Sequence, residues 1–188
     1  MKISELDEKQ ISETYCDFII PNFPRNERRP LKNMIGLLHD GKYTALGAFD
    51  ENDTIIGVAY LVRSGNIRML DYLAVRDDMR NHGIGAGILS ALREYCADDE
   101  YLILETEDPD RAKTEDEKTL QNRRLNFYLR NGFIFTGVRV KLFGAYFRIM
   151  SDRVIDDADI EKMKEHYLLM YSTLTSRHIL LHFLKFQN

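Results

Sequence analysis

Apolar residues recur along this chain with two different periods, which separate predicted helices from predicted strands. Ser4 to Ile20 and Glu27 to His39 carry apolar residues at helical spacing, and prolines punctuate the turn between them. Tyr43–Phe49, Ile55–Leu61 and Ile67–Val75 are rich in β-branched and aromatic residues. The pattern therefore predicts two early helices followed by three strands, with a hairpin at the polar turn between the first two strands.

The rest of the chain alternates between helical and extended segments. A helix is predicted over Gly83–Ala97 and a short strand over Tyr101–Glu105. Another helix is predicted to end at Asn131-Gly132, where Asn or Gly suits a left-handed C-terminal cap. Phe135–Lys141 and Ala145–Met150 are predicted as two further strands. This order of helices and strands is typical of a mixed α/β protein.

One turn carries more chemical information than the rest of the sequence. The segment from Arg80 to Ala86 follows a predicted strand and opens directly into a predicted helix. Gly83, Gly85 and Ala86 lack bulky side chains, so successive backbone N–H groups can converge on an anion. The positive end of the helix adds to the attraction. The turn is therefore predicted to hold a phosphate or pyrophosphate, with Arg80 beside it.

Two common phosphate-binding motifs do not fit this turn. A P-loop needs Lys and then Ser or Thr after its last glycine, and neither follows Gly87. A dinucleotide fingerprint needs a glycine where this chain has Ile88. It also follows the first strand of a βαβ unit, whereas several predicted strands come first here. The spacing of residues around the glycines therefore excludes both motifs.

Two segments, in the expected order, resemble the motifs of a known family. Arg80 to Ala86 resembles the acetyl-coenzyme A binding motif of the GNAT N-acetyltransferase superfamily, Arg-x-x-Gly-x-Gly/Ala. The segment from Arg124 to Phe133, which contains the end of a predicted helix, resembles the later GNAT motif, Phe/Leu-Tyr-x-x-x-Gly-Phe. One strand-like run separates the two motifs, and the resemblance covers Tyr43 to Ser151.

The resemblance implies a GNAT fold, in which a mostly antiparallel mixed sheet splays at the cofactor site and helices flank it. It implies acetyl-CoA as the co-substrate and no metal ion. Backbone groups of Leu73, Ala74 and Val75 would hold the pantetheine arm, and Gln121 stands where the family commonly has Asn. The residues expected to contact the cofactor are Leu73, Ala74, Val75, Arg80, Asn81, His82, Gly83, Ile84, Gly85, Ala86, Gln121 and Tyr128.

Tyr128 is the first catalytic candidate that the resemblance implies. Direct attack of an amine on a thioester needs a base for the amine, a donor for the oxyanion and an acid for the departing thiolate. A phenol with a pKa of about 10 can protonate a thiolate as it forms. Tyr128, four residues before Gly132, matches the family's usual general acid. The alternative is a tyrosine that only packs in the core.

Two carboxylates are candidates for the base. Asp71 lies on the predicted strand that ends at Val75, and Glu105 ends the next predicted strand. Either could accept the amine proton, directly or through water. The sequence leaves open whether Asp71, Glu105 or a water chain is the base.

The length and composition are ordinary for one globular domain, and they agree with the enzyme that the resemblance implies. The chain has 188 residues, of which 44% are hydrophobic and 30% are charged, and its formal net charge is −4. The pattern contains no signal-like or membrane-spanning segment, and Cys16 and Cys96 have no metal-like spacing. We therefore expect a cytoplasmic protein with no nucleic-acid or membrane partner.

An acidic segment bears on the choice of acceptor. Between Asp98 and Lys118, ten acidic residues are opposed by three basic residues. An acidic rim would concentrate a cationic amine, whereas a solvated acidic loop would have no such role. The favoured function is acetylation of a small cationic amine. The alternatives are a protein N-terminus or lysine as the acceptor, and a weakly catalytic acyl-CoA-binding regulatory module.

The C-terminal tail extends past the usual end of such a domain. Residues 1–151 are therefore predicted to form the acetyltransferase domain, and residues 152–188 a helical extension. Asp156, Asp157 and Asp159 can cap a helix at its positive end. The apolar stripe of this helix would consist of Ile160, Met163, Tyr167, Met170, Tyr171 and Leu174. This helix is expected to pack on the domain, with a homodimer contact or a lid over the substrate groove as the alternatives.

Overall fold

The computed structural model describes residues 1–174 and 177–187, and at residues 26 and 177–179 it describes the backbone alone. The chain divides into two compact units. The first unit comprises Met1–Arg63 and Arg68–Asp98, and the second comprises Ser64–Ile67 and the residues from Asp99 onward. In the described part of the chain, no helix is both long enough and apolar enough to span a bilayer.

The first unit is built on four strands in the order β1-β2-β3-β4. Its strands are β1 (Lys2–Glu5), β2 (Tyr43–Phe49), β3 (Ile55–Ser64) and β4 (Ile67–Val75). Its helices are α1 (Glu8–Thr14), α2 (Ile20–Asn22), α3 (Leu31–His39) and α4 (Ile84–Tyr95). β2 pairs antiparallel with both β1 and β3. The predicted strands β2, β3 and β4 and the predicted helix α4 are confirmed.

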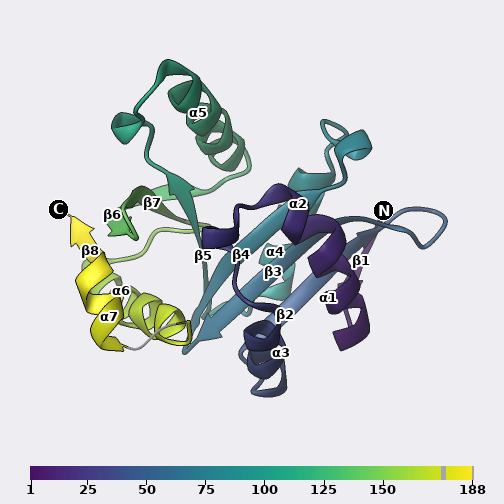
Figure 1. The fold of residues 1–188 in the computed structure, drawn as a ribbon, viewed down its shortest axis with the longest axis horizontal. Helices are drawn as coiled ribbons and strands as arrows, with labels where there is room; N and C mark the ends of the chain where they lie inside the picture. Colours follow the sequence, from purple (N-terminus) through teal and green to yellow (C-terminus); the bar gives the residue numbers. More distant parts are fainter. Residues whose placement is uncertain (175–176, 188) are drawn as a thin grey trace. The chain divides into compact units, whose positions relative to one another are not determined.

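Helices cover both faces of β3 (Figure 1). On one face, the hydroxyl of Tyr60 donates to the backbone carbonyl of Ile11 on α1, at 3.3 Å. On the other face, Gly57 lies against Ile84 and Ile88 of α4. Residues 57 and 60 point to opposite faces because side chains alternate along a strand. A Cβ on Gly57 would come within 2.9 Å of Ile88 Cδ1, so the glycine permits the close approach of α4.

The second unit carries four strands in the order β5-β7-β6-β8. Its strands are β5 (Tyr101–Glu107), β6 (Ile134–Leu142), β7 (Ala145–Ser151) and β8 (Leu184–Gln187). Its helices are α5 (Glu115–Arg130), α6 (Asp157–Ser172) and α7 (Arg177–Phe183). The pairings of β5 with β7, β7 with β6 and β6 with β8 are all antiparallel. The mixed α/β fold with mostly antiparallel strands is therefore confirmed, and the splay of its sheet stays a prediction.

Helix α6 runs along β5 within the second unit. Its N-cap is Asp156, one of the three aspartates predicted to cap it, which accepts from the backbone N–H of Asp159. The hydroxyl of Tyr101, at the start of β5, donates to Asp159 at 2.8 Å. Near the other end of the helix, the hydroxyl of Tyr171 donates to Glu105 at 2.6 Å. The buried side of α6 consists of Met163, Tyr167 and Met170.

The two ends of the chain differ from the pattern-based prediction. Lys2–Glu5 form the edge strand β1, where a helix was predicted to start at Ser4, and α1 begins at Glu8 because Asp7 caps it. Near the C-terminus, Leu184–Gln187 pair with β6 as a strand. Both strands are four residues long and are stabilised by partners far away in sequence, which local periodicity cannot reveal.

One helix boundary also differs. The helix predicted over Glu27–His39 begins at Leu31, directly after Pro30, because proline is favoured at the start of a helix and disfavoured inside it. The boundary predicted after residue 151 and the homodimer contact of the tail stay predictions. Residues 175, 176 and 188 of the predicted helical extension lie outside the described residues.

Candidate active site

The loop between β4 and α4, in the first unit, has the backbone shape of an anion nest. Asn81 and Gly83 have left-handed backbone angles, with φ of 65° and 79°. No side chain caps α4, so the first-turn N–H groups at Ile84, Gly85 and Ala86 have no capping partner. A Cβ atom on Gly83 would have no other atom within 4 Å, so a side chain would have room there. Glycine is favoured at this position because of the positive φ. This geometry suits a phosphate group.

Arg80 stands at this loop and already has two partners. Its Nη2 lies 2.5 Å from Oδ1 of Asp77 and donates to Oδ1 of Asn22 at 2.7 Å. Both Arg80 and His82 are exposed. A phosphate bound in the nest would therefore compete with Asp77 for a guanidinium that is already in place.

The predicted pantetheine contacts Leu73, Ala74 and Val75 lie at the C-terminal end of β4. Along β4, Leu73 and Val75 are partly exposed and alternate with the buried Ala74. Beyond the strand, the backbone N–H of Arg76 donates to the carbonyl of Ile56 on β3, at 2.9 Å. A strand presents backbone N–H and C=O groups with which an extended ligand can pair. The contact with the pantetheine arm stays a prediction.

Asp71, the first candidate base, is held by two donors in the first unit. Its Oδ2 accepts from Arg29 Nε at 2.8 Å and from the Tyr43 hydroxyl at 2.7 Å. Burial acts to lower the pKa of Arg29, but the charge and hydrogen bond of Asp71 outweigh it and the pKa is raised. Burial and, after it, the Asp71 charge raise the pKa of Tyr43. Asp71 is therefore the counter-ion of a buried guanidinium.

Glu105, the second candidate base, is held by the C-terminal helix in the second unit. It is half-buried on β5 and accepts the hydrogen bond from Tyr171 described above. Tyr167, one helical turn before Tyr171, is fully buried, and burial followed by the Glu105 charge raises the pKa of its phenol. The carboxylate thus lies against two tyrosines of α6.

Tyr128, the candidate acid, lies on α5 in the second unit. Its ring is half-buried and meets the rings of Phe127 and Phe133 edge-on, with centroids 5.3 and 6.1 Å away. Burial raises the pKa of Tyr128 to about 12, against a smaller lowering effect of Arg124. No other described residue makes a hydrogen bond to its hydroxyl. The phenol is therefore protonated at neutral pH and able to donate.

The end of α5 fixes the position of Tyr128. Gly132 has a φ of 82°, which confirms the predicted left-handed cap. The backbone N–H of Phe133 then donates to the carbonyl of Tyr128 at 3.1 Å. The cap turns Phe133 back against the Tyr128 ring, where it is buried.

Two other polar residues of α5 have different surroundings. The Oε1 atom of Gln121 is buried without a hydrogen-bond partner among the described residues, which is a costly state unless a ligand supplies a donor. Arg124 forms an ion pair with Glu107 on β5. Gln121 therefore has an unsatisfied acceptor, whereas Arg124 links its helix to the sheet.

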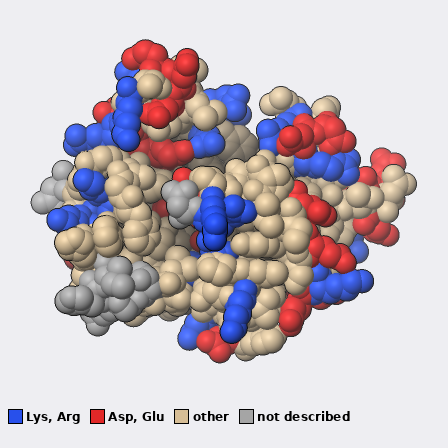
Figure 2. All heavy atoms as spheres, in the orientation of Figure 1, with Lys and Arg blue, Asp and Glu red and all other residues tan. Residues whose placement is uncertain are grey.

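The acidic segment is partly neutralised by arginines outside it. Asp108 is buried and accepts from Arg139 Nε at 3.0 Å and Arg148 Nε at 2.7 Å. Asp110 lies 2.6 Å from Arg148 Nη2. The interpretation as a solvated loop is therefore wrong for this part of the segment. Exposed carboxylates remain in the first turn of α5, over which Figure 2 shows acidic side chains gathered: Glu115, Asp116 and Glu117.

Residues 42–135, half of the chain, match the family model of the acetyltransferase (GNAT) domain. The chain belongs to the GNAT acetyltransferases. A search of curated proteins returned no significant match.

Solved GNAT structures are similar to this GNAT chain over most of its length. A putative GNAT acetyltransferase from Bacteroides thetaiotaomicron has a TM-score of 0.69 at 18% identity, covering 93% of this chain and 98% of that one. A spermidine N-acetyltransferase chimera from Vibrio cholerae and hSSAT has a TM-score of 0.61 at 10% identity, with coverages of 86% and 99%. An aminoglycoside 6'-N-acetyltransferase complexed with coenzyme A has a TM-score of 0.58 at 19% identity, with coverages of 83% and 98%. At identities this low, the similarities establish the fold and not the substrate.

Three residues that the sequence did not single out hold the candidate bases of this GNAT protein. Arg29 and Tyr43 bind Asp71, and Tyr171 binds Glu105. Each lies 28 or more positions from its partner, so no motif spacing connects them. The one available indication was the place of Tyr171 on the apolar stripe of the predicted C-terminal helix. Among the residues that the structure describes, no group of three or more His, Cys, Asp or Glu could hold a metal ion.

Proposed function

We propose that this GNAT protein transfers an acetyl group from acetyl-CoA directly to a primary amine, and that the acceptor is a small cationic amine. Tyr128 carries the proposal: its hydroxyl is protonated at neutral pH and has no hydrogen-bond partner in the described part of the chain. Such a group can protonate a thiolate as it departs. A protein that only bound an acyl-CoA would not need this donor.

The residues present fit the co-substrate, which would supply an activated acetyl thioester when bound. The left-handed Gly83 and the uncapped start of α4 suit the pyrophosphate. The orphaned Oε1 of Gln121 suits an amide N–H of the pantetheine arm. The family resemblance assigns the backbone of β4 to the pantetheine arm. The full set proposed to bind is Leu73, Ala74, Val75, Arg80, Asn81, His82, Gly83, Ile84, Gly85, Ala86, Gln121 and Tyr128.

Glu105 is the better candidate base. If Asp71 took up a proton, the buried guanidinium of Arg29 would lose its counter-charge, which is costly. Glu105 instead accepts a hydrogen bond from the neutral phenol of Tyr171, which orients the carboxylate without neutralising its charge. Glu105 would then accept the amine proton, while Asp71 keeps a structural role.

Two lines of support favour a small cationic acceptor. The spermidine and aminoglycoside N-acetyltransferases that share this fold are named for polycationic amines. The exposed carboxylates in the first turn of α5 provide negative charge that attracts a cation. A protein N-terminus or a lysine side chain is the alternative acceptor.

An amine panel tests this proposal. Release of free coenzyme A thiol is measured with polyamines, aminoglycosides, amino acids and basic peptides, for the wild type and for Glu105→Gln and Asp71→Asn. We expect turnover with a polyamine or aminoglycoside, and a loss of kcat of about 10²-fold or more in Glu105→Gln. Asp71→Asn is expected to retain kcat within a few-fold when it is folded. Turnover with peptides alone would contradict the proposed acceptor. A larger loss of kcat in Asp71→Asn than in Glu105→Gln would make Asp71 the base.

A further inference from the structure

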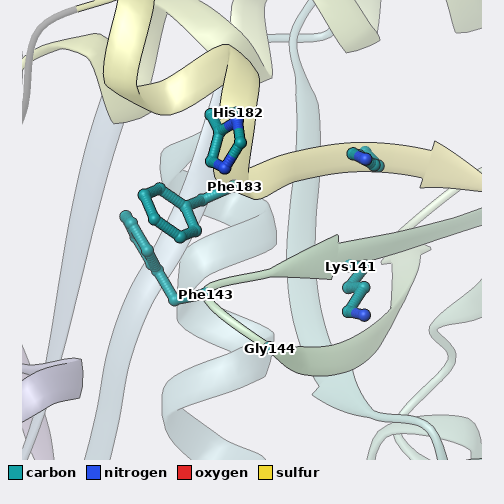
Figure 3. Close-up of a pocket in the computed structure, with 6 residues that line it drawn as sticks. Lys141, Phe143, Gly144, His182 and Phe183 are labelled. Atoms are coloured by element: carbon teal, nitrogen blue, oxygen red, sulfur yellow. The ribbon is translucent and has the colours of Figure 1, made fainter.

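A pocket of about 380 Å³ lies in the second unit, where the turn between β6 and β7 meets α7 and the start of β8. Figure 3 shows its walls, with two phenyl rings side by side and an imidazole beside them. Its lining residues are Lys141, Phe143, Gly144, His182, Phe183 and Lys185. None of these residues belongs to the proposed acetyl-transfer machinery.

The pocket carries two uncompensated positive charges. Lys141 and Lys185 are directly opposite each other on the antiparallel strands β6 and β8. Like charges in this position repel and destabilise the strand pair. Neither ammonium has an ion pair with a described carboxylate, and Lys141 makes only a cation–π contact with Tyr146, 5.1 Å from the ring centre. An anion bound between the two lysines would relieve this repulsion.

The same pocket exposes two aromatic rings beside the lysines. Phe143 is 53% exposed and Phe183 is 46% exposed. Their ring centroids lie 5.8 Å apart, and the backbone N–H of Phe143 donates to the carbonyl of Phe183 at 3.3 Å. Phe143, in the turn after β6, and Phe183, the last residue of α7, line the same pocket as Lys141 and Lys185. Charge and aromatic surface therefore adjoin in one pocket.

Phe143 is an unusual residue for the turn between β6 and β7. Phe143 and Gly144 are the two residues between β6 and β7, and both have positive φ, of 48° and 91°. A two-residue hairpin turn of this kind favours Asn-Gly, and a bulky residue at positive φ is strained. Such strain is found where a side chain has a role that the fold itself does not require.

We propose that this pocket binds a small anion carrying an aromatic ring, with the size and chemistry of a nucleoside monophosphate. The ring would lie on Phe143 and Phe183, and the phosphate between Lys141 and Lys185. The His182 imidazole could donate a hydrogen bond at the rim. The site is separate in its residues from the acetyl-CoA contacts and does not depend on the proposed function.

Calorimetric titration of the full chain with AMP tests the proposal. We expect AMP to bind, and adenosine and inorganic phosphate to bind at least tenfold more weakly when each is titrated alone. Lys185→Gln should weaken AMP binding at least tenfold, whereas Lys118→Gln, which removes the same charge on α5, should leave it unchanged. Equal weakening by both lysine variants, or no binding of AMP at millimolar concentration, would overturn the proposal.

Phe143→Asn separates binding from folding. If Phe143 serves the ligand, the variant should raise the Tm, because Asn tolerates the left-handed turn, and should weaken AMP binding at least fivefold. A lower Tm with unchanged AMP affinity would show that Phe143 only packs.

The protein saturated with coenzyme A should still bind AMP. If coenzyme A displaces AMP, and Gly83→Val abolishes the binding of both, the nucleotide occupies the acetyl-CoA site and the proposal fails.

Discussion

Asp71 carries its charge 2.8 Å from the buried guanidinium of Arg29. Two desolvated charges are tolerated as a pair, because each supplies the counter-charge that water no longer provides. The same arginine joins the segment before α3 to β4, since its backbone N–H donates to the Tyr72 hydroxyl at 2.6 Å. These contacts explain why a carboxylate on a functional strand can have a structural role.

Arg29→Met should therefore lower the free energy of unfolding by about 3–5 kcal/mol, because it leaves Asp71 without its buried counter-charge. Urea denaturation measures this loss. Lys9→Met is the control, since it removes an exposed pair with Glu13 at 3.7 Å and should cost at most about 1 kcal/mol. A loss in Arg29→Met as small as that of the control would refute the structural role of the pair.

The raised pKa of Tyr128, at about 12, makes a prediction for the pH dependence of catalysis. The phenol donates only when protonated, so a pKa above the usual value of about 10 extends its working range to higher pH. The ratio of kcat between the wild type and Tyr128→Phe should therefore stay constant from pH 7 to about 10. A ratio that halves by pH 10 would mean that the phenol ionises normally.

At the scale of the element, the start of α4 depends on one glycine. Gly83→Val places a β-branched residue at a φ of 79°, and it should abolish measurable binding of coenzyme A by distorting the anion nest. Gly137→Val is a matched control, because Gly137 has a φ of 84° and equally open surroundings on β6. Calorimetry should show coenzyme A binding retained in the control. Retained binding in both variants would place the pyrophosphate elsewhere.

Tyr101 and Tyr171 each form a hydrogen bond between β5 and helix α6, and the bond of Tyr171 reaches a candidate catalytic group. Tyr171→Phe should lower kcat several-fold, because the hydrogen bond that orients the Glu105 carboxylate is lost. Tyr101→Phe removes the bond to Asp159 at the other end of the helix and should leave kcat unchanged. Identical kinetics in the two variants would reduce Tyr171 to a packing role.

At the scale of the whole molecule, the features that could be predicted from the sequence are those that depend on residues close together along the chain. The strands β2 and β4, the nest at Gly83 and the cap at Gly132 follow from local period and from backbone angles that few residues tolerate. The strands β1 and β8 were missed because they are four residues long and exist through distant partners. The contacts that hold Asp71 and Glu105 were missed for the same reason.

The measurement that tests the account most directly is the kcat of Tyr128→Phe with the best amine of the panel, together with calorimetric binding of coenzyme A. The account predicts a fall in kcat of about 10²–10⁴-fold with coenzyme A affinity within twofold of the wild type, because only the proton donor is removed. Equal turnover in the variant would contradict the account by removing Tyr128 from the mechanism. Tight coenzyme A binding without turnover of any amine, even in the wild type, would contradict it by making the protein an acyl-CoA-binding module.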